Sequence, residues 1–595
     1  MKRIATVAIV VVAILAIAAA AAPFLIPGGF LKARVAAEVA SLTGRPVSIG
    51  GDAALAVYPE VTVSVGGLTV GNRQGAGDDP FVTADQLITR VRLLPLLLGR
   101  VEFDRFELVK PHVHLVVGKD GPNWSLADSA IVAPTAAGAA PADVRVGRLI
   151  VSDGVIDYDD VATSRREELS AIDLDVAWPV ADAAVSGSGT LQWRGEPVEF
   201  TAFLATPLDL IRGGVSQARF AIGSTPLRAV FAGRLTAVAA LQFDGQATVS
   251  TPSLRRAIEW LGTPMGQGSI LGAGSIEGVA NWTRSTISFD QADVELDGNT
   301  AQGALAATFG GVRPAVEGTL STDKLDLSPY LEAIRADVTA AGPWPMAPAR
   351  LPLAAALDAD VRLSADEVIM AGATTGRTVA TVALEDGALD VGVGEADFLG
   401  GKVTANLDLA AADDGLAAKA SATFDTVPAG PVLADLAGIS ALNGSASATF
   451  DLTSRGKTWG EVANNLAGTG KIAVADGSLA GFDMAALATA MGDPLAEPVS
   501  VGAGTTFFAG LTATLAIATG KISSDDLTMR GSDYALSLKG SGSVLSGSVQ
   551  AAGTLIKGGE SDALAITGTW SEPTVAPANA PTLPGALPAP AATPG

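Results

Sequence analysis

The only two histidines of the chain, His112 and His114, are the first residues that could do chemistry. They stand two residues apart in a segment that alternates like a strand, so both side chains project from the same face of it. Two imidazoles at this spacing could begin a zinc site, but zinc normally needs further protein ligands. Their neighbours are apolar or Lys110. The pattern favours two polar positions on the outer face of a strand, and we expect no metal there.

Three carboxylates farther along the chain, Asp157, Asp159 and Asp160, raise the possibility of calcium binding. Calcium takes about six to eight oxygen ligands, usually from a loop that contains a glycine. Here the carboxylates stand among Ile156 and Tyr158, and the alternation of a strand with one wet face explains them. We therefore expect a solvent-facing strand and no calcium site.

Catalytic motifs are not found. Gly456-Lys457-Thr458 ends like a phosphate-binding loop, but the first glycine of that motif would fall where Asp451 stands. The chain has no Cys, and a Ser nucleophile lacks a base because both histidines lie in one early strand. Carboxylates are plentiful, but no pair among them stands out. We expect no catalytic residue, no cofactor and no enzymatic activity.

The composition limits the partners of the chain. Its net charge of −23 repels phosphate backbones, so nucleic acid is not expected. Without Cys there are no disulfides or zinc–thiolate sites. The hydrophobic content of 48% against 17% charged residues is far from that of a disordered chain. The chain must bury or line a large apolar surface.

An uncharged apolar run from Ile4 to Leu31 follows Lys2 and Arg3. It is long enough to cross a bilayer once, and the preceding charges keep the N-terminus in the cytoplasm. We expect Ile4, Val7, Val11, Leu15 and Ile26 to lie in the bilayer. The alternative is a cleaved signal peptide, but the run exceeds the usual length of such a segment, which favours a retained anchor.

The remaining chain predicts a mainly β protein. A helix is expected from 30 to 43, and short helices at 253–262, 329–335, 428–438 and 459–468. Elsewhere apolar and polar residues alternate, as where Val294 and Leu296 stand between Asp293, Glu295 and Asp297. This alternation is typical of an antiparallel sheet with one apolar and one wet face.

Composition shifts predict the domain boundaries. We expect a membrane anchor at 1–31, an N-terminal domain at 32–126, a linker at 127–144, a middle β region at 145–337, a loop or linker at 338–352, a C-terminal β region at 353–571 and a disordered Pro/Ala-rich tail at 572–595.

Several short motifs, taken in order, resemble the AsmA family. They include Gly44-Arg45-Pro46-Val47, Pro80-Phe81, Asn123-Trp124, Asp323-Lys324-Leu325-Asp326 and Asn464-Asn465-Leu466-Ala467-Gly468. The resemblance runs from Lys2 to about Trp570. It implies an inner-membrane protein that reaches into the periplasm of Gram-negative bacteria and serves outer-membrane biogenesis. It also implies a chorein-like N-terminal region and a long, twisted antiparallel sheet that forms a groove.

The first function hypothesis is a passive conduit that moves phospholipids between the two membranes. Membrane phospholipids are the expected partners, and an outer-membrane or periplasmic protein is a further candidate. The expected groove lining is Leu241, Phe243, Val249, Phe289, Val294, Leu296, Phe450 and Leu452. The second hypothesis is a scaffold for outer-membrane protein assembly in which the apolar faces close on each other. A carboxylate-based envelope hydrolase is the third and weakest.

Overall fold

The computed structural model describes residues 28–578, except 57–59, 73–78, 92–102, 119–120, 125–144, 162–163, 239–240, 266–269, 341–345, 347, 350–356, 371–372, 413–414, 432, 434–440, 484–486, 488–498, 501–503, 544–545 and 570–571. The expected membrane segment before Gly28, the linker 127–144 and the tail beyond residue 578 lie outside the described residues. Among the helices that are described, none is long and apolar enough to cross a membrane.

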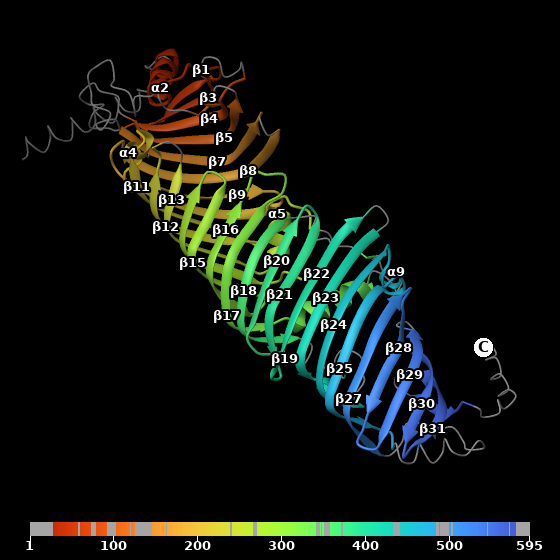
Figure 1. The fold of residues 1–595 in the computed structure, drawn as a ribbon. Coiled ribbons are helices and arrows are strands. Elements are labelled where there is room, and N and C mark those ends of the chain that lie inside the picture. Colours follow the sequence, from red (N-terminus) through yellow and green to blue (C-terminus); the bar gives the residue numbers. More distant parts are fainter. Residues whose placement is uncertain are drawn as a thin grey trace, which may run out of the picture. The chain divides into compact units, whose positions relative to one another are not determined.

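The chain is mainly β and divides into two compact units. The first is Met1–Gly262 with Gly272–Asp297, and the second is Thr263–Leu271 with Gly298–Gly595. Within each unit the strands lie side by side, largely in chain order, with a few short helices beside them (Figure 1).

The first unit begins with helix α2 (Gly28–Thr43), close to the predicted 30–43. Gly44 ends it in the left-handed conformation at φ 68°, which a residue without Cβ adopts at low cost. The strands of this unit are β1 (Val47–Ile49), β2 (Ala53–Ala56), β3 (Thr62–Val70), β4 (Val82–Val91), β5 (Phe103–Gly118), β6 (Gly121–Pro122), β7 (Arg145–Asp160), β8 (Arg165–Val180), β9 (Val185–Trp193), β10 (Glu196–Leu204), β11 (Val215–Ser224), β12 (Arg228–Thr236), β13 (Gln242–Thr251), β14 (Gly274–Thr283) and β15 (Thr286–Leu296). Helices α4 (Pro207–Ile211) and α5 (Leu254–Trp260) interrupt the succession of strands.

The second unit contains α6 (Ser328–Ala340) and α9 (Trp459–Asn464). Its strands are β16 (Asn299–Thr308), β17 (Ala315–Asp326), β18 (Asp358–Met370), β19 (Ala373–Thr375), β20 (Thr378–Glu385), β21 (Ala388–Phe398), β22 (Gly401–Ala412), β23 (Gly415–Pro428), β24 (Leu442–Gly456), β25 (Ala467–Ala480), β26 (Val499–Ser500), β27 (Thr505–Ala518), β28 (Lys521–Arg530), β29 (Tyr534–Ser543), β30 (Ser548–Lys557), β31 (Glu560–Thr569) and β32 (Pro573–Pro577). Helices α5, α6 and α9 fall where short helices were predicted.

The prediction of a wholly antiparallel sheet is wrong at two places. β5 pairs with β7 in parallel, and β17 pairs with β18 in parallel. Neighbouring strands elsewhere in the described units pair antiparallel, as β10 does with β9 and β11. A parallel neighbour requires a long crossover connection. Residues 119–144 provide one such connection, and α6 with its following segment provides the other.

The prediction of disorder from residue 572 onward is wrong for β32. This strand pairs antiparallel with both β31 and β26, and its Val575 is 2% exposed. The prolines at 573 and 577 stand at the two ends of the strand, where a missing N–H is tolerated. Helix α6 also extends to Ala340, so it overlaps the start of the predicted loop at 338–352.

Each unit contains one large buried cluster. In the first unit, Val35 of α2 packs on β3, β4 and β5 in a cluster that includes Val65, Leu87 and Phe106. In the second unit, a cluster at β25–β32 includes Phe508 and Leu555. Burying a side chain of this size contributes about 1.5–3 kcal/mol, so these clusters stabilise the sheet strongly where they occur.

Candidate functional site

One face of the sheet in the first unit is apolar from strand to strand. Residues directly opposite each other in neighbouring strands lie on the same face, so the register identifies its members. One row from β9 to β15 reads Gly187, Ala202, Phe220, Phe231, Ala247, Gly278 and Ala292. Every residue in it is apolar or glycine. We call this side of the strands the apolar face.

Four aromatic rings gather on the apolar face between β11 and β14. The ring centroids of Phe231 and Phe243 lie 5.0 Å apart, and those of Phe243 and Trp282 lie 4.9 Å apart. Phe220 lies 5.6 Å from Phe243. These side chains are only partly buried, and Trp282 is 41% exposed. A closed core would cover such rings, so the apolar face is open here.

The opposite face of the same strands is mostly polar. On β13 it presents Gln242, Asp244, Gln246 and Thr248, and Arg234 of β12 donates to Asp244 at 3.1 Å. Four large apolar residues are exposed on this face, and by register none pairs with another of them: Phe203, Val215, Val230 and Val279. Single apolar residues on a surface are ordinary and carry no functional argument. The two faces therefore differ in kind.

The second unit has an apolar face built in the same way. A row from β16 to β27 reads Gly303, Leu320, Leu363, Ala380, Val393, Ala405, Ala422, Phe450, Gly470 and Leu515. Most of these residues are partly exposed as far as β24, and the face is then covered by the cluster at β25–β32.

The structure places most of the residues predicted to line the groove on the apolar face. In the first unit the members are Phe243 and Val249 on β13 and Phe289, Val294 and Leu296 on β15. In the second unit they are Phe450 and Leu452 on β24. Phe289 is 6% exposed and belongs to a small buried cluster with Ala280 and Ala292. Leu241 precedes β13 and is 52% exposed, so it lies outside the paired strands. That these residues contact lipid stays a prediction.

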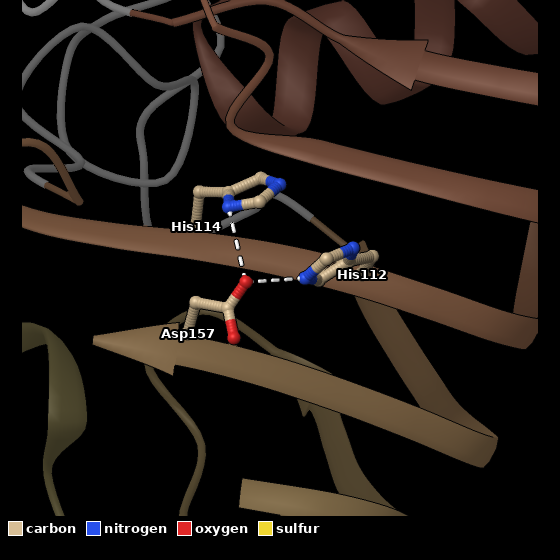
Figure 2. Close-up of side chains that lie close together, drawn as sticks. All are labelled: His112, His114 and Asp157. Atoms are coloured by element: carbon tan, nitrogen blue, oxygen red, sulfur yellow. Dashed lines mark hydrogen bonds and ion pairs between the residues drawn. The ribbon is translucent and has the colours of Figure 1, made fainter. Parts of the chain in front are cut away.

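The two histidines and one of the three aspartates lie close together on β5 and β7 (Figure 2). Val113 is paired with Val82, which packs against the buried cluster under α2, so His112 and His114 project to the opposite, polar face. The left-handed Lys110 (φ 48°) interrupts the alternation of β5 between Leu108 and His112. Parallel pairing of β5 with β7 puts His114 opposite Asp157 and His112 opposite Val155. Asp157 Oδ2 lies 2.6 Å from His112 Nε2 and 3.5 Å from His114 Nδ1. The sequence does not reveal that the histidines and the aspartate are neighbours, because nothing in it shows that these two strands pair in parallel.

Three residues of the family-like motifs, Arg45, Phe81 and Asn123, form a junction in which Arg45 and Asn123 are buried. The Arg45 guanidinium lies 3.8 Å from the centre of the Phe81 ring and donates to the backbone oxygen of Asn123. Asn123 is 2% exposed, and its side chain donates to the carbonyl of His114 at 2.9 Å. It also accepts from the N–H of Val116 at 3.0 Å. These residues fasten the segment after α2 to the end of β5.

A protein-family model covers the residues of this junction. The AsmA family model matches residues 1–195 and 285–527, which is most of the chain. The chain belongs to the AsmA family. Arg45, Phe81 and Asn123 lie in the matched part, whereas the aromatic rings of β11–β14 lie in the unmatched stretch. Neither the comparison with curated proteins nor that with solved structures finds a match. AsmA family membership suggests a role related to outer-membrane biogenesis or lipid transport.

A charged pair anchors α5 beside the apolar face. Trp260 of α5 packs against Trp193 of β9 with ring centroids 4.7 Å apart, and Arg194 Nη1 donates to the Trp260 carbonyl at 2.9 Å. Glu167 accepts from Arg194 Nε at 3.0 Å and from Trp193 Nε1 at 3.1 Å. Partial burial opposes ionisation of Glu167, but these hydrogen bonds and the Arg194 charge outweigh it and lower the pKa of Glu167 to about 2.

Proposed function

We propose that the chain is a single-pass inner-membrane protein whose bulk lies in the periplasm. There it conducts phospholipids along its apolar face between the inner and outer membranes. The observation that carries this proposal is the open apolar face, which follows the hydrogen-bonded register from strand to strand within each unit. The activity is passive transfer along a surface and requires no catalytic residue.

An acyl chain suits this surface physically. Removing apolar area from water contributes roughly 25 cal/mol per Å², and Phe220, Phe231 and Phe243 leave such area uncovered. Glycine and alanine stand among the larger side chains along the rows, so the surface offers shallow places where a flexible chain can lie. Contiguous exposed apolar surface of this kind marks a place where another apolar group binds.

The polar parts of a lipid would stay in water. A net charge of −23 makes the protein a poor ligand for a phosphate group, and the apolar face offers few polar side chains. Recognition would then depend on the acyl chains, with little selection among head groups. Weak selection among head groups suits a conduit that carries many phospholipids, whereas a selective pocket would recognise one head group.

Lipid carried by the purified full-length chain tests the proposal. The chain would be extracted from membranes in a lipid-preserving polymer, and its phospholipids counted by mass spectrometry. A variant with Phe243→Asp and Val249→Asp places charge on the apolar face of β13. Its matched control, Gln246→Asp with Thr248→Asp, adds the same charge to the polar face of the same strand. Lipid around the membrane segment is a common background for all three proteins.

We expect several phospholipids per chain above background in the unchanged protein and in the control, and a loss of these in the apolar-face variant. Equal lipid in all three folded proteins would contradict the proposal. The apolar face would then serve to pack against protein, and a scaffold in outer-membrane protein assembly would become the better account.

A further inference from the structure

We propose that His112, His114 and Asp157 bind a zinc ion on the polar face of the first unit. One ligand atom from each residue lies within 4.8 Å of the other two. These are the only histidines of the chain, and they stand on β5 while the carboxylate stands on β7. Figure 2 shows the two rings and the carboxylate turned toward one another. Imidazole and carboxylate are ligands that zinc takes in proteins.

One donor–donor distance already suits a tetrahedral ion, and a second would have to lengthen. With zinc–ligand bonds of about 2.0–2.2 Å, neighbouring donors stand about 3.3–3.5 Å apart. His114 Nδ1 and Asp157 Oδ2 are already 3.5 Å apart. His112 Nε2 and Asp157 Oδ2 are 2.6 Å apart, so this hydrogen bond would lengthen by roughly 0.7–0.9 Å to admit an ion. The His112 side chain is 42% exposed, which leaves its ring room to rotate.

The backbone that carries the site is held from both sides. The N–H of His114 donates to the Phe81 carbonyl at 2.9 Å, and the His114 carbonyl accepts from the buried Asn123 side chain at 2.9 Å. Parallel register fixes Asp157 opposite His114. Ligands on paired strands are held more firmly than ligands on loops, so little ordering is needed when the metal binds.

Two neighbouring aspartates pair with basic side chains, whereas Asp157 contacts the two imidazoles. Asp159 pairs with Arg166 at 3.4 Å, and Asp153 lies 4.0 Å from Lys110. Glu168 of β8 stands directly opposite Asp157, so its carboxylate adds negative charge on the same face. Three protein ligands leave a fourth position for water, and the side chains are about a third to two-fifths exposed, which gives the ion access.

A bound ion would link β5 to β7, which form one of the two parallel strand pairs. The segment that joins these strands in the chain is long, so their hydrogen bonds and side-chain contacts must keep them together. A ligand that binds only the folded state stabilises it in proportion to the logarithm of ligand concentration over Kd. A bound ion would therefore stabilise the pairing of β5 with β7, on the face opposite the apolar face.

Zinc titration of the full-length chain, purified without a histidine tag, tests the site. Because the chain has no Cys and no other His, competing sites are few. Calorimetry should give one saturable zinc per chain, and zinc should raise the melting temperature. His112→Gln, His114→Gln and Asp157→Asn should each weaken binding at least about tenfold, since even indirect ligand supports cost about 10–100-fold. Asp244→Asn, an equal change of charge on β13, should bind as the unchanged chain does.

Absence of saturable zinc binding would overturn the proposal, and so would variants that bind zinc like the unchanged chain. Melting each variant without metal shows that it is folded. His112 and Asp157 are exposed enough that their substitution should leave the fold intact, even if His114→Gln disturbs β5. Cobalt(II) gives a second readout, because tetrahedral coordination by these ligands produces visible absorption that the variants should lack.

Discussion

Two regions of the apolar face differ in what covers them. At β3–β5, α2 lies over the face, and Val65 and Leu87 are 0% and 1% exposed. The same face continues by register from Leu108 to Val151 and on to β15, where Phe231 and Phe243 are partly exposed. Strand alternation is the same in both regions. The difference teaches that the covering element decides whether an apolar face is a core or an available surface.

Leu87→Ala should give the largest effect because it empties a covered site. Replacing a fully buried Leu with Ala typically costs about 2–5 kcal/mol, including the cavity that remains. We expect the free energy of unfolding to fall by this amount when urea unfolding is monitored with a spectroscopic probe in the first unit. A loss below about 1 kcal/mol would mean that the covered region relaxes like an open one.

Acid should loosen α5, the helix beside the open part of the face. The pKa of Glu167 falls from its ordinary 4.5 to about 2 in the folded protein. A depressed folded pKa gives stability that is present above the unfolded value and is lost as pH falls toward 2. The contribution is roughly 1–3 kcal/mol after allowance for partial solvent exposure.

Glu167→Gln should therefore be less stable than the unchanged chain at pH 7, and the difference should shrink between pH 5 and pH 2. Thermal unfolding across this range measures it. The matched control is Glu199→Gln, an exposed carboxylate on β10. A constant difference from pH 7 to pH 2 would show that the charge of Glu167 does not stabilise this junction.

Phe231→Ala should separate stability from binding on the open face. The ring is partly exposed and can be truncated without leaving a closed cavity, so we expect a loss of only about 1–2 kcal/mol. Lipid bound per folded chain should nevertheless fall. A stability loss equal to that of Leu87→Ala would place Phe231 in a closed core.

Gln246→Ala on the polar face sets the baseline of the comparison. Surface substitutions away from special features usually change stability by less than about 0.5 kcal/mol. We expect neither stability nor bound lipid to change, as measured by urea unfolding and mass spectrometry. A loss of lipid in this variant would show that the two faces do not differ in function.

Much of the architecture is readable in the sequence because burial on one face imposes a period of two. Phe243 and Val249 could be assigned to the same face as each other for this reason. Helix α5 could be placed because Ser253 precedes it, and the Ser253 side chain accepts from the N–H of Arg256. These signals are local.

The two parallel strand pairs and the histidine–aspartate cluster could not be predicted from the alternation of apolar and polar residues. Alternation shows which face a residue occupies but gives no strand direction. Long connections before β7 and β18 were the available signal, since parallel neighbours need a crossover. His114 and Asp157 are distant in sequence, and only the β5–β7 register brings them together. Leu241 fits the period of β13 but falls just before the strand begins.

Site-specific photo-crosslinking along β12 tests the central claim most directly. A photoreactive amino acid would replace Ala229, Val230, Phe231 and Ala232 one at a time in the membrane-bound, full-length chain. Positions 229 and 231 belong to the apolar face, and 230 and 232 to the polar face. We predict phospholipid adducts at 229 and 231 and none at 230 and 232, although Val230 is itself apolar and 54% exposed. Adducts at all four positions, or at none, would contradict a lipid path along the apolar face.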